Sequence, residues 1–430
     1  MRGPSATPRS DSASRSWSRD AVFYRISPRS FCDSSGNAVG DLDGVRERIG
    51  YLELLGIDGI WLTSVLRSPV FKRPGDERRL DPMIGGTDSL GQLVAEAHAA
   101  GIRVAIDLSV VRGALDDPDN RPELESAVRF WLDHGVDGFR VCTSPGMSTA
   151  ASEQTAALVR AVRPAVEDDG VHFLSALIDG EWSQRLGDRD QLDLGIDLRF
   201  ASCGSEPDAL RPVIDDVLRD AESLRMIPAW TRARPDRFEP VVRYGSGEVG
   251  LKRCKAMLLI KLALPGIIGL EGGEELGLLE ADLPGEIGVE PLRSIMLWEG
   301  STPPFGFSEA PGNWWPMTPG WAPYTVEAQL ADPASTLSLY RRALEISKTH
   351  PAFRGEHIAW YGAPAGCLAF HRVEGGLTCA LNTSRAPVPL PDGEVLLTSD
   401  AVDDGHLPPN AAVWLVTSAQ AGHINSGSSA

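Results

Sequence analysis

Four arginines lie where predicted strands end, and a guanidinium group is suited to bind phosphate or carboxylate through paired hydrogen bonds. They are Arg112, Arg140, Arg232 and Arg234. If the strands run parallel, their ends meet at one mouth, so the pattern indicates a site for an anionic ligand such as a sugar phosphate or an acidic loop of a partner protein. The alternative is internal neutralisation, because buried charges must be paired. The acids available for it are Asp107, Asp137, Asp236 and Glu181.

A thiol stands in the same region. Residues 135–142 read GVDGFRVC, the end of a helical pattern followed by a short apolar run. Arg140 would favour the thiolate form of Cys142 if the two side chains met, which is the pattern of a reactive cysteine. The alternative is a small, half-buried hydrophobic residue, the usual role of an unpaired cysteine.

Composition and charge restrict the possible partners and compartments. The 430 residues include 59 acidic and 41 basic ones, a net charge of −18, which disfavours nucleic acid and anionic membranes as partners. The six cysteines show no C-x-x-C pair and no metal-ligand spacing, as is typical of thiols in a reducing compartment. The N-terminus lacks an apolar targeting segment and no run reaches membrane length, so we expect a cytoplasmic protein.

The elements that must position these groups alternate regularly. Short apolar runs occupy 21–26, 57–62, 103–108, 138–142, 172–178, 192–198, 226–230 and 267–270. Helical patterns lie near 45–55, 88–100, 122–134, 150–165, 182–187, 207–224, 251–263 and 333–349. Strands that are apolar throughout are covered on both faces, so this α/β pattern predicts a (β/α)8 TIM barrel. A doubly wound open sheet is the alternative, but no G-x-G-x-x-G follows the first run.

The hydrophobic pattern of the sequence changes after residue 350. Period-two runs at 367–373, 377–382, 394–398 and 412–416, separated by turn residues, predict a C-terminal antiparallel β domain. We therefore expect a disordered tail over 1–16, the barrel over 17–350, the β domain over 351–417 and a second tail over 418–430.

Several strings resemble one known family. They are DAVFY and PRSF within 20–31, GDLDGV at 40–45, LLGIDGIWL at 54–62, GFRVC at 138–142, and LPG followed by GEELG within 264–277. Together they resemble the α-amylase family, glycoside hydrolase family 13, in its oligo-1,6-glucosidase, trehalose synthase and α-glucosidase branch. The resemblance implies a barrel with a C-terminal β-sandwich, and cleavage or transfer of α-glucosides with retention of configuration, which requires a carboxylate nucleophile and a carboxylic acid. The family adds a third carboxylate that holds the sugar.

When the family's catalytic positions are matched to this sequence, none of the three carboxylates is present. The family nucleophile ends a G-F-R-(I/V)-D string and corresponds to Cys142, while the acid at the end of the fifth strand corresponds to Ala176. The third carboxylate, in an N-H-D string, corresponds to Arg234. The third-strand pattern D-x-x-x-N-H keeps Asp107 but has Arg112 in place of the histidine.

These replacements lead to three hypotheses. The first is a non-catalytic member of the family, a pseudo-glycosidase that binds a sugar, an anionic sugar derivative or a protein and has a regulatory or scaffolding role in carbohydrate metabolism. The second is an α-glucosidase or transglycosidase in which Glu181, Asp179 or Asp236 has taken over proton transfer, Glu181 standing in a G-E-W string. Glu181 is otherwise explained as a carboxylate at a helix start. The third is a barrel kept purely for protein interaction.

Two further features follow from the resemblance. The family's inserted domain after the third strand is reduced to the short segment 112–122. The loop from 33 to 41 resembles the branch's calcium loop, with oxygen-bearing positions at Asp33, Ser35, Asn37, Val39 and Asp41. Because serine and asparagine replace two usual carboxylates, we expect at most weak Ca²⁺ binding and no other cofactor.

Overall fold

The computed structural model describes residues 19–63, 65–66, 78–110, 120–143, 150–166, 172–178, 192–231, 247–277, 295–310, 317 and 319–416, with backbone alone at 109–110, 142–143 and 150–154. The predicted tails at 1–16 and 418–430 and the helical pattern near 182–187 lie outside these residues.

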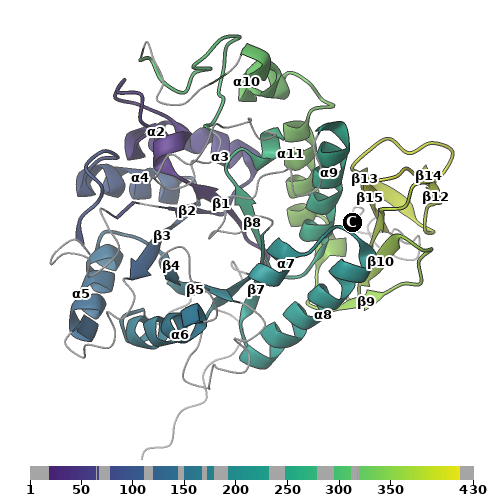
Figure 1. The fold of residues 1–430 in the computed structure, drawn as a ribbon, viewed down its shortest axis with the longest axis horizontal. Helices are drawn as coiled ribbons and strands as arrows, with labels where there is room; N and C mark the ends of the chain where they lie inside the picture. The colour runs from purple at the N-terminus through teal and green to yellow at the C-terminus, as the bar shows by residue number, and fades with distance from the viewer. Residues whose placement is uncertain are drawn as a thin grey trace, which may run out of the picture.

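Eight parallel strands close into a barrel in chain order (Figure 1). They are β1 (Val22–Ile26), β2 (Gly59–Leu62), β3 (Arg103–Val110), β4 (Gly138–Thr143), β5 (Phe173–Ile178), β6 (Leu194–Asp197), β7 (Ile227–Thr231) and β8 (Ile267–Glu271). Hydrogen bonding between β1 and β8 completes the ring. The predicted (β/α)8 barrel is therefore confirmed, and the predicted strands differ from the observed ones by a few residues at their ends.

Helices surround the barrel (Figure 1). They are α1 (Pro28–Phe31), α2 (Leu42–Glu47), α3 (Ile49–Leu55), α4 (Thr87–Ala99), α5 (Asn120–Asp133), α6 (Ala150–Val162), α7 (Leu198–Ser202), α8 (Pro207–Leu224), α9 (Gly247–Ala263), α10 (Val326–Leu330) and α11 (Thr336–Thr349). Because α5 begins at Asn120, the last residues of the predicted shortened insertion are helical. Gly56 ends α3 with φ 87°, a backbone conformation that favours glycine and turns the chain into β2.

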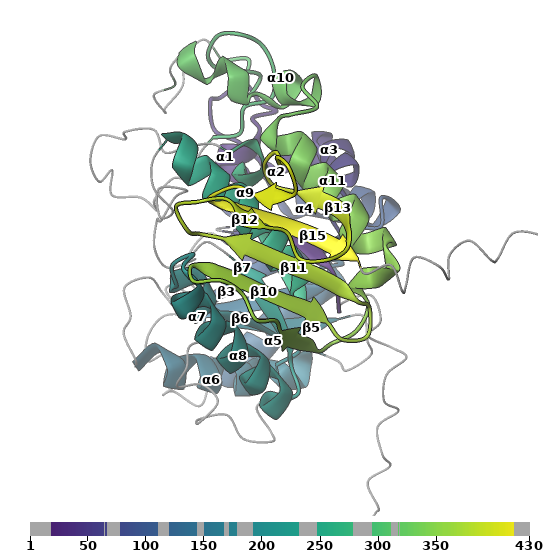
Figure 2. The same ribbon diagram turned by 90° about the vertical axis from the view of Figure 1, so that its right-hand side faces the viewer.

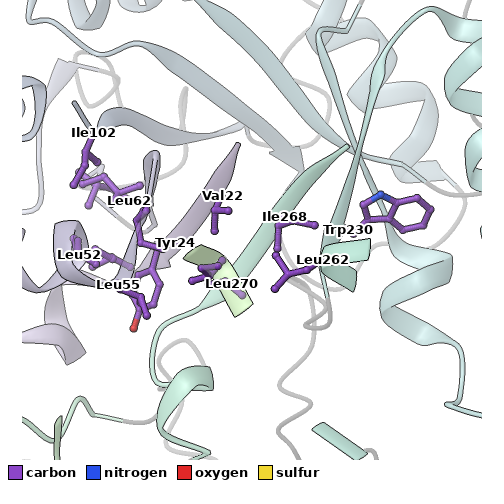
Figure 3. Packing of buried hydrophobic residues seen from close by; sticks show 14 of the residues in the cluster. Val22, Tyr24, Leu52, Leu55, Leu62, Ile102, Trp230, Leu262, Ile268 and Leu270 are labelled. Carbon is purple, nitrogen blue, oxygen red and sulfur yellow. The ribbon is translucent and has the colours of Figure 1, made fainter. Parts of the chain in front are cut away.

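The two faces of each strand differ in what they contact. Outward-facing side chains pack on the helices, and Figure 3 shows this packing around β1 and β8. Inward-facing side chains form an apolar layer inside the barrel, toward the N-terminal ends of the strands. It comprises Ala21, Phe23, Trp61, Ala105, Phe173, Leu194, Ile196, Ala229 and Ile267. Phe23 stacks on Trp61 with ring centroids 4.6 Å apart and meets Phe173 edge-on at 5.4 Å. This layer closes the barrel interior, so any opening lies at the C-terminal ends of the strands.

Three aspartates at the N-terminal end of the barrel share one arrangement, which we call the aspartate bracket. Each directly precedes an even-numbered strand, donates its backbone N–H to the carbonyl of a residue in the preceding strand, and accepts that same residue's N–H on its carboxylate. The pairs are Asp58 with Val22, Asp137 with Val104, and Asp193 with Leu174, with N–O distances between 2.7 and 3.0 Å. Basic side chains complete each carboxylate, namely Lys348, Arg103 with His98, and Arg163 respectively.

A buried carboxyl group follows β8 in the chain. Glu275 follows that strand in a short 3-10 turn (Glu274–Leu276), and its Oε1 accepts hydrogen bonds from the hydroxyls of Tyr24, at 2.8 Å, and Tyr51, at 2.5 Å. Its Oε2 has no hydrogen-bond partner among the described residues. Neighbouring Glu274 is instead paired with buried Lys261 at 2.9 Å.

The C-terminal part forms a small two-layered β structure beside α9 (Figure 2). One layer is a five-stranded antiparallel sheet in the order β13 (Glu394–Thr398), β15 (Ala411–Val416), β11 (Leu377–Asn382), β10 (Cys367–Arg372), β9 (Ile358–Trp360), and the other is the pair β12 (Val388–Pro389) and β14 (His406–Leu407). This agrees with the predicted C-terminal sandwich, although β9, β12 and β14 were not predicted. Buried Arg372 joins it to the barrel by donating to the carbonyl of Ala263 at the end of α9, and it also donates to the carbonyls of Phe353 and Gly355 in the segment between α11 and the sheet.

Candidate functional site

A layer of charged side chains lies above the apolar layer, toward the C-terminal ends of the strands. It contains Arg25, Asp107, Arg140 and Glu271, and we call it the polar layer. Each of these residues is two positions beyond an inward-facing residue of its strand, respectively Phe23, Ala105, Gly138 and Gly269. Since side chains alternate across a strand, all of them face the barrel interior. At Gly138 the inner face is crowded, because a Cβ there would lie 2.7 Å from the carbonyl oxygen of Phe173.

Asp107 and Arg140 form the tighter pair of this layer. Arg140 Nε donates to Asp107 Oδ1 at 2.7 Å and its Nη2 donates to Oδ2, a two-pronged contact between adjacent strands. The Arg140 side chain is 3% exposed and that of Asp107 is 13% exposed. The charge of Arg140 is therefore paired within the barrel. For this residue the structure agrees with internal neutralisation, the alternative to an anion-binding site.

Arg25 and Glu271 form the second pair, which the sequence analysis missed. Arg25 Nη1 lies 3.3 and 3.4 Å from the two carboxylate oxygens of Glu271, across the β1–β8 contact that closes the ring. The exposed fractions of their side chains are 8% and 16%. A signal was present in the sequence, since each charge interrupts an otherwise apolar run, but their proximity depends on barrel closure.

The strand β5 requires a correction. Ala176 was predicted to occupy the position of the family's acid, yet its side chain lies in the outer cluster with Leu174 and Ile178, facing the helices. Beyond Phe173, the inward-facing residues of β5 are Ser175, whose hydroxyl donates to the carbonyl of Phe139 at 3.1 Å, and Leu177, which packs on the apolar layer. Position 176 is therefore not part of the mouth, and neither inward position at this level carries a carboxyl group.

Asp137 also requires a correction. It was considered as a neutralising acid at the mouth, but it precedes β4 and lies at the N-terminal end of the barrel, where Arg103 and His98 contact it at 2.8 Å. Several predicted site residues lie outside the described residues, namely Arg112, Arg232, Arg234, Asp179, Glu181, Asp236 and the side chain of Cys142.

The loop predicted to bind calcium is filled by protein donors. Asp33 Oδ1 accepts hydrogen bonds from the backbone N–H groups of Ser35, Gly36 and Asn37 and from the Ser35 hydroxyl. Its Oδ2 accepts from the N–H of Ala38 at 2.7 Å and from the Ser308 hydroxyl at 2.5 Å. Burial opposes ionisation, but these hydrogen bonds outweigh it and lower the pKa of Asp33.

Two of the other predicted ligands of that loop, Asp41 and Asn37, also accept hydrogen bonds from protein donors. Asp41 accepts from Gly44 N at 2.7 Å as the N-cap of α2 and from the Ser34 hydroxyl at 2.8 Å, while Asn37 accepts from Val39 N at 2.8 Å. These N–H and hydroxyl groups compete with a cation for the carboxylate oxygens, and weak Ca²⁺ binding in this loop stays a prediction. Within the described ranges no cluster of three or more His, Cys, Asp or Glu is placed to hold a metal.

None of the helices in the described part of the chain combines the length and apolar character needed to cross a membrane.

Comparisons with known proteins point in one direction. Residues 25–112 match the family model "Alpha amylase, catalytic domain". A probable alpha-glucosidase of Rhizobium meliloti (strain 1021) is 26% identical over 498 residues, covering 86% of this chain and 90% of the relative. An oligo-1,6-glucosidase of Heyndrickxia coagulans is 37% identical over 137 residues, covering 28% of this chain and 24% of the relative.

Solved structures agree on the fold. The alpha-glucosyl transfer enzyme XgtA superposes with a TM-score of 0.75 at 23% identity, covering 93% of this chain and 99% of that one. The isomaltulose synthase SmuA from Protaminobacter rubrum gives a TM-score of 0.76 at 18% identity with the same coverage of both chains. At these identities the likeness shows the fold alone.

Proposed function

We propose, from the relationship of this chain to the α-amylase family, that its barrel mouth binds an α-glucoside. The relatives found by sequence include α-glucosidases and an oligo-1,6-glucosidase by name, and two of them align along most of this chain. The polar layer supports the proposal, because its guanidinium and carboxylate groups offer donors and acceptors to sugar hydroxyls at the end of the barrel where such proteins bind ligands.

The same mouth favours binding without the family's cleavage chemistry. Retaining cleavage needs a carboxylate nucleophile and a carboxylic acid roughly 5–5.5 Å apart. The observation that carries this proposal is that no inward-facing residue of β5, namely Phe173, Ser175 and Leu177, is acidic. The sequence has Cys142 at the family's nucleophile position. Loss of a general acid alone costs roughly 10²–10⁴ in rate. A regulatory or scaffolding role in carbohydrate metabolism follows if the bound sugar is a signal rather than a substrate.

The comparisons favour a second candidate, an α-glucosidase or transglycosidase, because the relatives are named as enzymes. In that case a carboxyl group from elsewhere in the chain must replace the missing acid. Glu181, Asp179 and Asp236 are the candidates from the sequence.

One experiment on the purified chain tests both candidates. Binding of maltose, trehalose and isomaltose is measured by calorimetry, and turnover of these sugars and of aryl α-glucosides is measured in parallel. We expect binding of at least one sugar and no turnover above background. Turnover that is abolished in the Glu181→Gln variant would establish the second candidate, and absence of binding to every sugar would refute both.

A further inference from the structure

Lysine is rare in this chain, so the environment of each amine can be considered separately. Five of the 41 basic residues are lysines, at positions 72, 252, 255, 261 and 348. Lys72 lies outside the described residues. The other four differ in what holds the amine, and this matters for chemistry, because a lysine attacks an electrophile only in its uncharged form.

Three of the four described lysines have a carboxylate partner. An ion pair of this kind favours the charged ammonium form and so suppresses the nucleophile. The pairs, measured from Nζ to the carboxylate oxygen, are Lys261 with Glu274 at 2.9 Å, Lys348 with Asp58 at 2.6 Å, and Lys252 with Asp400 at 3.0 Å.

Lys255 is the exception. Within the described ranges its amine forms no ion pair and no hydrogen bond, and the carboxylates of Asp400 and Asp332 act on it only through their charge. Both carboxylates already have other partners. Asp400 is paired with Lys252, and Asp332 accepts a hydrogen bond from the N–H of Ala334 at 2.9 Å.

The position of Lys255 on α9 also disfavours a charged amine. The side chain is partly buried, and the residues directly before and after it in the helix are buried. Burial lowers the pKa of Lys255, although the charges of Asp400 and Asp332 act in the opposite direction. For Lys252, three residues earlier, the hydrogen bond to Asp400 raises the pKa. A larger share of Lys255 than of Lys252 is therefore uncharged near neutral pH.

The charges around Lys255 restrict the reagents that suit it. Asp400 and Asp332 repel an anionic electrophile such as an acyl phosphate. With an aldehyde, Nζ forms a bond to the carbonyl carbon, the carbonyl oxygen leaves as water, and the resulting imine takes up a proton. The protonated imine keeps the positive charge of the lysine, so its attraction to both carboxylates persists, whereas acylation would remove it.

From these observations we propose that Lys255 is a site of covalent modification by small uncharged aldehydes, including the open-chain form of reducing sugars, which it holds as an imine. Lys255 lies on α9, one of the helices outside the barrel (Figure 1). The proposal is therefore independent of what the barrel mouth binds.

The rate of modification at each lysine tests the proposal. The full chain is treated near neutral pH with a limiting amount of D-glyceraldehyde and with cyanoborohydride, which reduces each imine to a stable secondary amine. Peptide mass spectrometry then gives the initial rate at every lysine. We expect Lys255 to react about threefold faster than Lys252, or more, since the ion pair with Asp400 keeps Lys252 protonated. A rate at Lys255 equal to or below that at Lys252 would refute the proposal.

Unfolding in guanidinium chloride shows whether the fold causes the difference. It removes the surroundings of both amines, so the rates at Lys255 and Lys252 should become equal. A difference that persists in the unfolded chain would assign the reactivity to neighbouring sequence and would contradict the proposal.

Two variants test the protective effect of ion pairing. Asp400→Asn removes the partner of Lys252, so Lys252 should react faster than in the wild type. Asp404→Asn is the matched control, because it removes the same charge from an exposed residue outside these ion pairs. An unchanged rate at Lys252 in the first variant, or an equal rise in the control, would contradict the reasoning.

D-glyceraldehyde 3-phosphate tests the charge of the reagent. The rate at Lys255 is divided by the rate of the unfolded chain with the same reagent, which corrects for differences between the two aldehydes. We expect this normalised rate to be lower for the phosphate by about threefold or more, because Asp400 and Asp332 repel it. An equal or higher value for the phosphate would overturn the assignment to uncharged aldehydes.

Discussion

Replacing Glu275 by glutamine should remove a large part of the pH dependence of folding. The Glu275 carboxyl is 0% exposed, and burial raises its pKa to about 7 although the hydrogen bonds from Tyr51 and Tyr24 act in the opposite direction. Its ordinary value is 4.5. At pH 6 the folded chain therefore holds a proton here that the unfolded chain has released.

The sign follows from this difference. Below about pH 4.5 both states are protonated, and the group contributes its full stability. As pH rises toward 7 the unfolded state becomes increasingly favoured, and the loss levels off once the folded state also ionises. The difference 7 − 4.5 = 2.5 in pKa corresponds to about 3.5 kcal/mol at roughly 1.4 kcal/mol per pKa unit, and about 3 kcal/mol of it is lost between pH 4.5 and 7.5.

Urea unfolding of the wild type and of Glu275→Gln at pH 4.5, 5.5, 6.5 and 7.5 measures this loss. Glutamine keeps the shape and an acceptor for both tyrosines but cannot ionise. We expect the unfolding free energy of the wild type, relative to the variant, to fall by about 3 kcal/mol across this range. Glu345→Gln, on an exposed part of α11, is the control and should show a flat difference. A flat difference for Glu275→Gln as well would refute the reasoning.

Three other expectations concern the described residues. Asp137→Ala leaves Arg103 and the Val104 N–H without their buried acceptor. Urea unfolding should therefore show a loss of about 3–5 kcal/mol in the free energy of unfolding, and a loss below about 1 kcal/mol would contradict this expectation. Arg372→Met removes three hydrogen bonds, one to the barrel helix α9 and two to the segment between α11 and the sheet. Thermal scans should show a loss of about 3 kcal/mol in the free energy of unfolding, whereas an unchanged midpoint would show that this junction does not limit stability. Millimolar Ca²⁺ or a chelator should leave the melting temperature unchanged, because N–H and O–H groups of the protein already donate hydrogen bonds to both carboxylate oxygens of Asp33. A rise of several degrees with Ca²⁺ would show that the loop binds the ion.

The fold was predictable because its strands are short and mostly apolar. The predicted run at 138–142, which lies within β4, has Arg140 as its one charged residue, and a strand so largely apolar is covered by helices outside and filled inside. The residues 182–187, predicted as helical, lie outside the described part and remain a prediction.

The site was predictable only where local sequence fixes position. Arg140 was placed at the mouth by its place within the strand, but the choice of Ala176 was one residue off, and a shift of one residue moves a side chain to the other face of the sheet. Asp137 was misplaced for a related reason, since a residue just before a parallel strand lies at the end opposite the mouth.

Long-range contacts were beyond local reasoning. Arg25 and Glu271 are 246 residues apart and meet only because the ring closes. The donor that completes Asp33 comes from Ser308, 275 residues away. No spacing rule connects residues at such separations.

The aspartate brackets divide the barrel unevenly. Their side-chain bonds join β1 to β2, β3 to β4, and β5 to β6. No bracket spans the intervening seams, which depend on ladder hydrogen bonds, packing and, between β4 and β5, the bond from the Ser175 hydroxyl to the carbonyl of Phe139. A chain cut between β2 and β3, or between β4 and β5, would keep every bracket within one fragment, while a cut inside a bracketed pair would separate a carboxylate from the amide it holds. Fragments of the first kind are the ones that should reassemble when mixed, so from β1 to β6 the barrel consists of two-strand units rather than of single strands.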